Sequence, residues 1–520
     1  MHLLSTMTST PEVFFPPDAV PDEATHQEEL DSKHASERLA QEAARPFMDM
    51  PAPFSLPIVG TMWMHLPGGP LHGLSFEKKM ERLRDTYGPI IRERVLLNFQ
   101  LVHVFRPEDI ETVYRLEGAR PRREGFRLLQ KYNNKYNDGV QGIITSQGEV
   151  WHRLRSKTQG RLLKPKSVAA YLNIHNGVAD DLVASIGRLR NTEGIIEDFL
   201  PELYKFAMEG IGFVCFNRRV GALDENIPAD SDTFRFIEAV NDVMTVSHSE
   251  NKSFFVSEWS SEFKKLRRAQ TFIKEMSTRQ ALQTLEMMST NELQLDAEGG
   301  DLIRYLMTKT DLSQAEVLTV ISEFFFAGVD TTSHVLGFAL YALAQNPEVQ
   351  EKLIEEIDRV TDGSDVISSD MIGRMPYLKA VAKETFRVTP ITPGNGRTLD
   401  NDIVLSGYHV PAGIMFGLHH DVACKSPQYV SEPDRFLPER WLRGGSGDLG
   451  TIHPFVLMPF GFGPRSCVGR RLAEQEYSLG LIKILQKFRV EYAHNELLNY
   501  TMSIINTPTT PLKFRFLERK

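Results

Sequence analysis

Near the C-terminus of this 520-residue chain, one short segment has the sequence Phe460-Gly461-Phe462-Gly463-Pro464-Arg465-Ser466-Cys467-Val468-Gly469. Glycines, a proline and an arginine surround a single cysteine, and a pattern of helical period follows. A cysteine in such a loop lies in the positive field of the helix N-terminus, where backbone N–H groups and Arg465 favour the thiolate. The segment therefore predicts a cysteine that can ligate a metal.

A lone thiolate suits an axial haem ligand better than a structural zinc site, because no second cysteine stands at zinc spacing. The chain has only two other cysteines, Cys215 and Cys424, so a disulfide framework is excluded. The alternative for any single cysteine is an inert buried thiol.

The rest of the chain predicts a mainly α-helical protein with a small β region. Helical period is found at residues 77–85, 166–190, 234–243, 312–345, 347–360, 377–388 and 470–487, and strand patterns at 90–97, 101–105 and 403–410. Asn346-Pro347 marks a helix start, with Asn346 as the expected N-cap. No linker divides the chain after a proline-rich entry at residues 51–60, so we expect residues 46–520 to form a single large domain.

Composition excludes several classes of protein. The hydrophobic content of 41% is enough for a core, and the net charge of −9 disfavours a partner bound through nucleic-acid phosphates. No apolar run reaches the roughly 18 residues of a membrane span. The first fifty residues alone carry a charge of −7, so residues 1–45 are expected to be an acidic, disordered extension. Mitochondrial transit peptides have the opposite composition.

With these features the chain resembles a known family, the haem-thiolate monooxygenases of the cytochrome P-450 superfamily. The family pattern Phe-x-x-Gly-x-Arg-x-Cys-x-Gly is matched at all five fixed positions, and the resemblance covers about residues 46–520. It implies the cytochrome P-450 fold, haem b (iron protoporphyrin IX) as cofactor, Cys467 as the axial ligand of the haem iron, and activation of dioxygen.

Further motifs of that family follow in the expected order. Glu384 and Arg387 form the Glu-x-x-Arg helix motif, and a spacing of three puts both charges on one helix face. On its own such a pair is common on solvated helices. The resemblance implies that Arg440 joins the pair in a buried ion network that holds the loop beneath the haem, and that Trp441, where the family often has Phe, has no functional consequence.

Ala327-Gly328-Val329-Asp330-Thr331-Thr332 places polar residues and a glycine inside an apolar helix. Such local conflicts often mark function, and a Thr hydroxyl can bond back to an upstream carbonyl and open a groove. The resemblance assigns Thr331 to hydrogen bonding of iron-bound dioxygen and Asp330 to proton relay. A helix kink without chemistry is the alternative.

Trp151 and Arg155 stand four residues apart on one helix face, and both carry donors suited to a carboxylate. The resemblance implies that they hold a haem propionate, and that Arg397 and Arg465 occupy other propionate-binding positions. Without the family, ordinary surface packing would explain a Trp/Arg pair.

Electrons must come from another protein, because the chain shows no P-loop and no flavin or nicotinamide site. Residues 445–450 match the dinucleotide fingerprint by letter but neither follow a strand nor open a helix. Four bases, Lys379, Lys383, Arg470 and Arg471, would make a positive patch near the thiolate that steers an acidic partner. Their surroundings resemble the mitochondrial class, which implies a 2Fe–2S ferredoxin with its reductase; four solvated bases are the alternative.

Within that class the chain is similar to the sterol 27-hydroxylase and vitamin D hydroxylase group, which includes a retinol desaturase. The matching stretches are residues 161–166, 204–210 and 392–397. The resemblance implies a monooxygenase that hydroxylates a lipophilic sterol, secosteroid or retinoid. The alternatives are desaturation of a retinoid-like substrate and a non-catalytic haem sensor, which would not need Asp330-Thr331.

The resemblance also implies a mitochondrial protein, peripheral on the inner membrane, with the endoplasmic reticulum surface as the alternative because the N-terminus is acidic. An aromatic stretch of Phe254, Phe255, Trp259 and Phe263 precedes four bases and could dip into a membrane. Ordinary helix packing is the alternative for this stretch.

Overall fold

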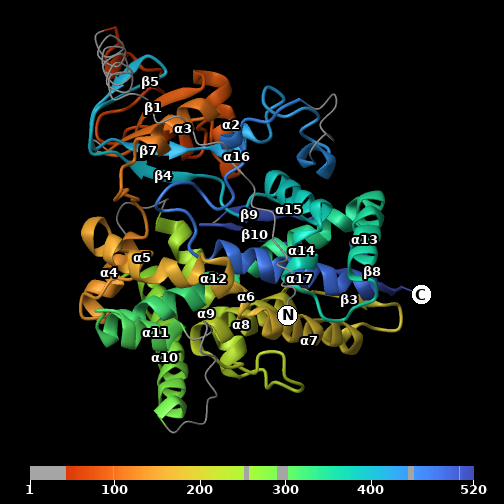
Figure 1. Ribbon diagram of the computed structural model, residues 1–520. Helices are drawn as coiled ribbons and strands as arrows, with labels where there is room; N and C mark the ends of the chain where they lie inside the picture. The colour runs from red at the N-terminus through yellow and green to blue at the C-terminus, as the bar shows by residue number, and fades with distance from the viewer. Residues whose placement is uncertain are drawn as a thin grey trace, which may run out of the picture.

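The computed structural model describes residues 43–97, 99–250, 257–289, 302–442, 450–502 and 504–519. The prediction of a mainly helical chain with a small β region is confirmed (Figure 1). The larger helices are α2 (Phe76–Tyr87), α4 (Arg127–Tyr136), α5 (Gly148–Leu162), α7 (Leu172–Leu189), α8 (Leu200–Phe216), α9 (Asp232–Glu250), α10 (Ser261–Ser289), α12 (Gln314–Gln345), α13 (Pro347–Thr361), α15 (Pro376–Val388) and α17 (Arg470–Lys487).

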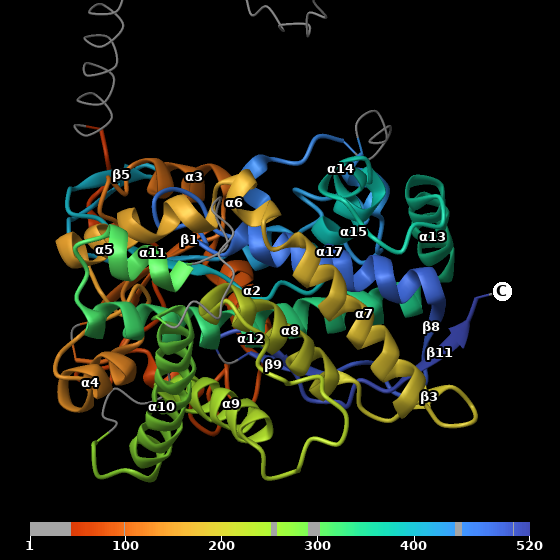
Figure 2. The same ribbon diagram turned by 60° about the horizontal axis from the view of Figure 1, so that its bottom comes forward.

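Helix α12 crosses the middle of the helical body and packs against α8, α10, α15 and α17 (Figure 2). It begins with a capping box, in which Ser313 accepts from the Glu316 N–H while the Glu316 carboxylate accepts from the Ser313 N–H. Buried apolar residues cover most sides of the helix, as expected for a helix in the core of a large domain. This position lets one face of α12 contribute to an internal site.

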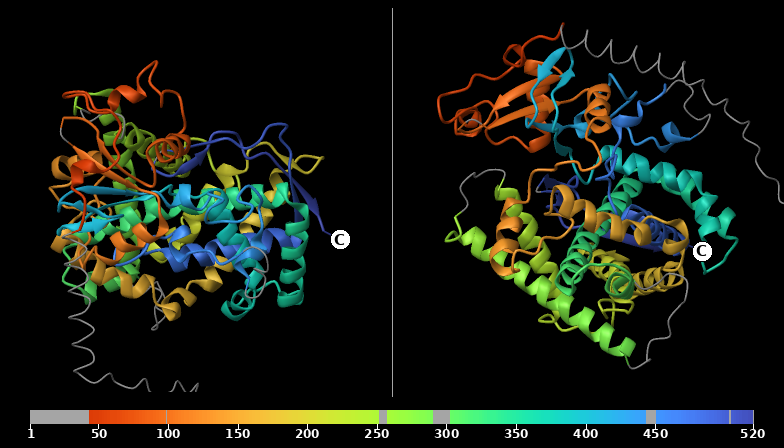
Figure 3. Two further views of the ribbon diagram at one scale, coloured as in Figure 1. Left: turned by 90° about the horizontal axis from the view of Figure 1, so that it is seen from above. Right: turned by 60° about the vertical axis from the view of Figure 1, so that its left-hand side comes forward.

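The largest sheet lies to one side of the helical body (Figure 3). Its strand order is β1 (Ile90–Arg94), β2 (Gln100–Val104), β7 (Met415–Leu418), β4 (Asn395–Thr398), and only β2 and β7 run parallel. In β4, Arg397 pairs with Phe416. The predicted strand at 403–410 is a hairpin of β5 (Ile403–Leu405) and β6 (Tyr408–Val410), with positive φ at Ser406 and Gly407 in the turn.

One local prediction is wrong. The helix expected over residues 166–190 is divided into α6 (Pro165–Ala169) and α7, and the break lies beside Tyr171, whose buried ring stacks on His175. The predicted helix start at Asn346-Pro347 is confirmed, with Asn346 at the N-cap position of α13. The Asn346 amide donates to the Ala342 carbonyl of α12 at 2.8 Å, and its side chain makes no capping bond to α13.

The N-terminal extension lies almost wholly outside the described residues. Arg45 already contacts the folded part, since its N–H donates to the Gly407 carbonyl at 2.9 Å and its guanidinium stacks on Tyr408. In the part of the chain that the structure describes, no helix is both long enough and apolar enough to cross a membrane.

Candidate active site around Cys467

The segment from Phe460 to Gly469 folds into a tight loop directly before α17. The Cys467 N–H donates to the Phe460 carbonyl at 2.8 Å, and the Ser466 N–H donates to the Gly463 carbonyl at 3.0 Å. Gly463 has a φ of 73°, and a β-carbon there would collide with the Glu117 carboxylate. Glycine is therefore required for the loop to close around the cysteine.

The Cys467 side chain is accessible, although protein surrounds it closely. Burial raises the pKa of the Cys467 thiol, while the Gly469 N–H and the charges of Arg155, Arg123 and Arg470 act in the opposite direction. The backbone N–H therefore favours the thiolate, as predicted, while burial favours the thiol. A coordinating thiol is deprotonated by the metal itself.

Four arginines cluster together beside the cysteine. Arg155 from α5, Arg397 from β4 and Arg465 from the loop are buried, and Arg123 is half-buried. Burial, followed by repulsion from Arg123, Arg397 and Arg155, lowers the pKa of Arg465 to about 9. The nearest carboxylate, Glu117, accepts from Arg397. The cluster therefore holds more positive than negative charge.

The arginine cluster fits the carboxylates of a haem. Arg465 donates to the carbonyls of Pro121 (3.0 Å) and Ser146 (2.8 Å), which fixes its guanidinium. Its Nη1, like Nε of Arg123, is buried with no hydrogen-bond partner among the described residues. Such donors are costly to bury unless an anionic acceptor meets them, and a pair of propionates has the required charge and geometry.

Arg123 was missed by the sequence analysis. Its only signal is an Arg-Arg pair after Pro121, in a loop with no helical period. Burial lowers the pKa of Arg123 to about 10, with repulsion from Arg397 adding to the effect. Trp151, which is also expected to hold a propionate, lies beneath the Arg465 guanidinium, which stacks over its ring at 4.2 Å.

On α12, Thr331 and Asp330 have different surroundings. The Thr331 hydroxyl donates back to the Ala327 carbonyl at 2.9 Å, as predicted, while α12 stays continuous from end to end. Thr331 is half-buried, whereas Asp330 is buried and accepts from the Tyr204 phenol of α8 at 2.8 Å. Packing explains why residue 328 is glycine, because a β-carbon there would lie 2.7 Å from Ile211 Cγ1.

Comparison with known families matches residues 50–516 to the family described as Cytochrome P450. The chain belongs to the cytochrome P450 family. This P450 is 33% identical to a probable cytochrome P450 12a5, mitochondrial, of Drosophila melanogaster, over 91% of each chain. It is 33% identical to the human mitochondrial sterol 26-hydroxylase (79% of this chain, 78% of the relative) and 34% identical to the human mitochondrial 25-hydroxyvitamin D-1 alpha hydroxylase (75% and 78%). Members of this family are haem b monooxygenases, so the chain is an oxidoreductase.

The Glu384 network of this P450 is fully buried, and the structure brings the three predicted residues together. Arg387 makes a two-pronged contact with the Glu384 carboxylate at 2.8 and 2.9 Å, and Arg440 Nε donates to it at 3.1 Å. The other donors of both arginines reach backbone carbonyls of residues 424–435. The network thus ties α15 to the segment that leads toward the cysteine loop.

The four predicted partner-binding bases of the P450 are all exposed. Lys379 and Lys383 project from α15 while Glu384 and Arg387 on the same helix are buried, as expected from their angular separation. Arg470 and Arg471 open α17, and Arg470 pairs with Glu474 at 2.9 Å. The fingerprint-like residues 445–450 lie outside the described residues except for Gly450.

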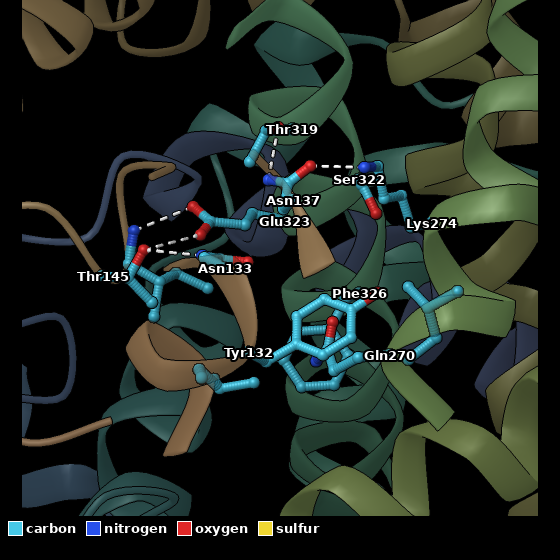
Figure 4. A pocket seen from close by; sticks show the side chains of 13 residues that line it. Tyr132, Asn133, Asn137, Thr145, Gln270, Lys274, Thr319, Ser322, Glu323 and Phe326 are labelled. Carbon is cyan, nitrogen blue, oxygen red and sulfur yellow. Dashed lines mark hydrogen bonds between the residues drawn. The ribbon is translucent and has the colours of Figure 1, made fainter. Parts of the chain in front are cut away.

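A small polar cavity lies beside α12 in this P450, between α4 and α10 (Figure 4). Glu323 reaches into it from α12, two turns before Thr331, and its Oε2 accepts from the Ile144 N–H at 2.8 Å. Burial raises the pKa of Glu323 to about 7, against the effects of the Ile144 and Ile143 N–H groups and of Arg123. Glu323 was not among the site residues predicted from the sequence.

Proposed function

We propose that this P450 is a haem-thiolate monooxygenase in which Cys467 is the axial ligand of the haem iron. The observation that carries the proposal is a cluster of four arginines beside one accessible cysteine that precedes a helix N-terminus. When bound, haem b supplies iron-centred activation of dioxygen. Trp151, Arg155, Arg397 and Arg465 would hold its propionates together with Arg123, and the Trp151 ring would also support the Arg465 guanidinium.

Thr331 and Asp330 would hold and transfer protons for the dioxygen chemistry that the haem would supply. The Thr331 hydroxyl, held by Ala327, can pass a proton from its Oγ1 and take one back. Asp330, the residue before Thr331, would resupply that hydroxyl. Proton delivery by positioned side chains contributes about 10²–10⁴-fold to enzymatic rates.

The substrate class follows from the relatives. Two of them are named for sterol and vitamin D hydroxylation, which supports a lipophilic sterol, secosteroid or retinoid as substrate here. Insertion of one oxygen is the proposed outcome; desaturation of a retinoid-like substrate would show as a loss of two hydrogens. A haem sensor is disfavoured because Asp330-Thr331 would then have no task.

A ferredoxin is the proposed electron donor. Lys379 and Lys383 are exposed on α15, and Arg470 and Arg471 are exposed at the start of α17, directly after the cysteine loop. An acidic 2Fe–2S ferredoxin with its reductase matches these four bases in charge. The double variant Lys379→Gln/Lys383→Gln should raise the KM for ferredoxin several-fold and weaken its salt dependence. Equal KM values would contradict this donor site.

We place the enzyme in the mitochondrion, because the matched relatives include proteins named as mitochondrial. A peripheral position on the inner membrane remains part of the proposal. Phe254 and Phe255 lie outside the described residues, and Trp259 is 83% exposed. Phe263 is buried in the core, so it is excluded from membrane contact.

The first experiment tests the ligand and the reaction together. Cys467→Ala should abolish the thiolate-specific absorbance of the reduced carbon monoxide complex, and an unchanged spectrum would refute the assignment. The unmodified protein, with NADPH, ferredoxin and its reductase, should add one oxygen to a member of a sterol, secosteroid and retinoid mixture, detected by mass spectrometry. Turnover only with the microsomal flavin reductase would instead favour the endoplasmic reticulum surface.

A further inference from the structure

Three polar groups surround the phenol of Tyr204 in the core between α8, α9 and α12. The Tyr204 oxygen lies 2.8 Å from Asp330 Oδ1, 3.1 Å from His334 Nε2 and 3.0 Å from Asn241 Oδ1. Asp330 and His334 are one helical turn apart, with Nε2 and Oδ1 separated by 3.9 Å. The phenol therefore bridges an acid and an imidazole that do not hydrogen-bond to each other.

The protonation states of this cluster follow from burial. His334 is completely buried, and burial lowers its pKa despite the opposing effect of Asp330, so the imidazole is neutral near pH 7. Burial, followed by the charge of Asp330, keeps the pKa of Tyr204 well above its usual value, so the phenol keeps its proton. Among the described residues, Asp198 is the other charge that acts on Tyr204.

A neutral imidazole has one N–H, and a phenol has one O–H. The proton of Tyr204 can satisfy only one acceptor, and the carboxylate is the strongest acceptor nearby. If Nε2 of His334 carries the imidazole proton, His334 donates to Tyr204 and Tyr204 donates to Asp330, so both contacts are hydrogen bonds. The opposite tautomer would leave Asp330 Oδ1, His334 Nε2 and Asn241 Oδ1 competing for the phenol proton.

We propose that Tyr204 and His334 form a buried relay that resupplies protons to Asp330. The relay rests on the proposed role of Asp330. The Tyr204 proton moves to Asp330 Oδ1 as the His334 Nε2 proton moves to the Tyr204 oxygen. His334 then takes up a solvent-derived proton at the buried Nδ1, which requires the core around α12 to open transiently. Each group ends with the proton count it began with, except Asp330, which has gained one.

A packing role alone does not explain this cluster. Asp330 Oδ2 and His334 Nδ1 are buried with no hydrogen-bond partner among the described residues. Leaving such atoms unsatisfied costs about 1–3 kcal/mol each, and an apolar side chain would avoid that cost. One turn further along α12, Phe338 packs in the core as an apolar residue should. On α12, this polar cluster therefore comprises Asp330 and His334 and does not extend to Phe338.

The unmodified holoprotein tests the hydrogen-bond direction without turnover. In the reduced carbon monoxide complex labelled with ¹⁵N-histidine, the resonances of His334 are identified by their loss in His334→Gln. The expected result is an Nε2–H tautomer that does not titrate between pH 6 and 8.5. An Nδ1–H tautomer, or an imidazolium near pH 7, would overturn the relay.

Two variants then separate proton transfer from hydrogen bonding. Tyr204→Phe removes the bridge, and His334→Gln keeps an N–H donor but cannot relay a proton. Product formed per NADPH should fall about tenfold in both, with the substrate KM and the carbon monoxide spectrum unchanged, and the solvent isotope effect should change. Tyr132→Phe, which loses a 3.1 Å contact with Thr271, is the matched control and should keep the original ratio.

Asp330→Asn, measured in parallel, distinguishes a failure of the proposed role of Asp330 from a failure of the relay alone. Should Asp330→Asn leave the product ratio intact, the role of Asp330 fails and the relay fails with it. A low ratio in Asp330→Asn with a normal ratio in Tyr204→Phe and His334→Gln would refute the relay alone. If a variant fails to bind haem, the tautomer of His334 in the unmodified protein still tests the relay.

Discussion

The indole Nε1 of Trp441 donates to Glu384 Oε2 at 2.9 Å, inside the buried network of α15. Glu384 also accepts from Arg387, Arg440 and the Leu437 N–H. A carboxylate that is buried completely is stable only when its acceptor sites are filled. Trp441 fills one that Phe could not, so it has a structural role in this network. That the residue has no functional consequence stays a prediction.

Replacing Trp441 by Phe should therefore destabilise the protein. The ring volume is largely kept, but a hydrogen bond to a charged group is lost, which is worth about 1.5–3 kcal/mol. Urea unfolding of the holoprotein measures the change. Lys383→Gln is the control, because it removes the base stacked over the same indole while leaving the bond to Glu384 intact. Equal loss in both variants would mean that stacking, not the indole N–H, is responsible.

Removing Arg123 should act in opposite directions on the protein with and without haem. Arg123→Met relieves the repulsion among the four arginines, so the apoprotein should unfold at a higher temperature. The same change removes a propionate partner, and haem should dissociate about tenfold faster, as for the loss of one charge-assisted contact. Calorimetry of the apoprotein and haem transfer to apomyoglobin measure the two effects. Slower haem loss would exclude Arg123 from the site.

Local patterns explain why the sequence predicted some of this site and not the rest. Cys467, Arg465 and the helix pairs Trp151/Arg155 and Glu384/Arg387 belong to short motifs, so spacing alone brings them together. Arg123 and Tyr204 reach the site by tertiary folding only. Tyr204 is 126 residues from Asp330, and nothing in its own segment indicates an acid as its partner.

Helix boundaries, too, can be predicted from the sequence only where a local pattern determines them. Helix α12 was predicted almost to the residue because its apolar pattern is long and a capping box starts it. The break at Tyr171 could not be predicted, because it depends on the packing of that ring against His175 and Phe213. Asn346 has the right residue type for a cap, yet the preceding helix offers its amide a carbonyl.

Glu323 should make stability depend on pH. Its pKa is raised to about 7 by burial, above the unfolded value of 4.5, so folding favours the protonated form. The native state therefore loses stability as pH rises from about 4.5 to about 7, and the loss is complete above that. Glu323→Gln keeps an acceptor for the Ile144 N–H without the charge. Its melting temperature should match the unmodified holoprotein at pH 4.5 and exceed it at pH 8; a constant difference would contradict a raised pKa.

The variant Gly328→Ala tests whether packing requires the glycine of the Ala327–Thr332 segment. Alanine normally stabilises a helix interior by about 0.5–1 kcal/mol relative to glycine. At Gly328 the new β-carbon would lie 2.7 Å from Ile211 Cγ1, and overpacking costs about 1–3 kcal/mol. Gly328→Ala should therefore lower the free energy of unfolding. Gly177→Ala in α7, where nothing lies within 4 Å of the new carbon, should raise it. If both variants gain stability, α8 can move away from α12, and the close approach of Ile211 is not what selects glycine.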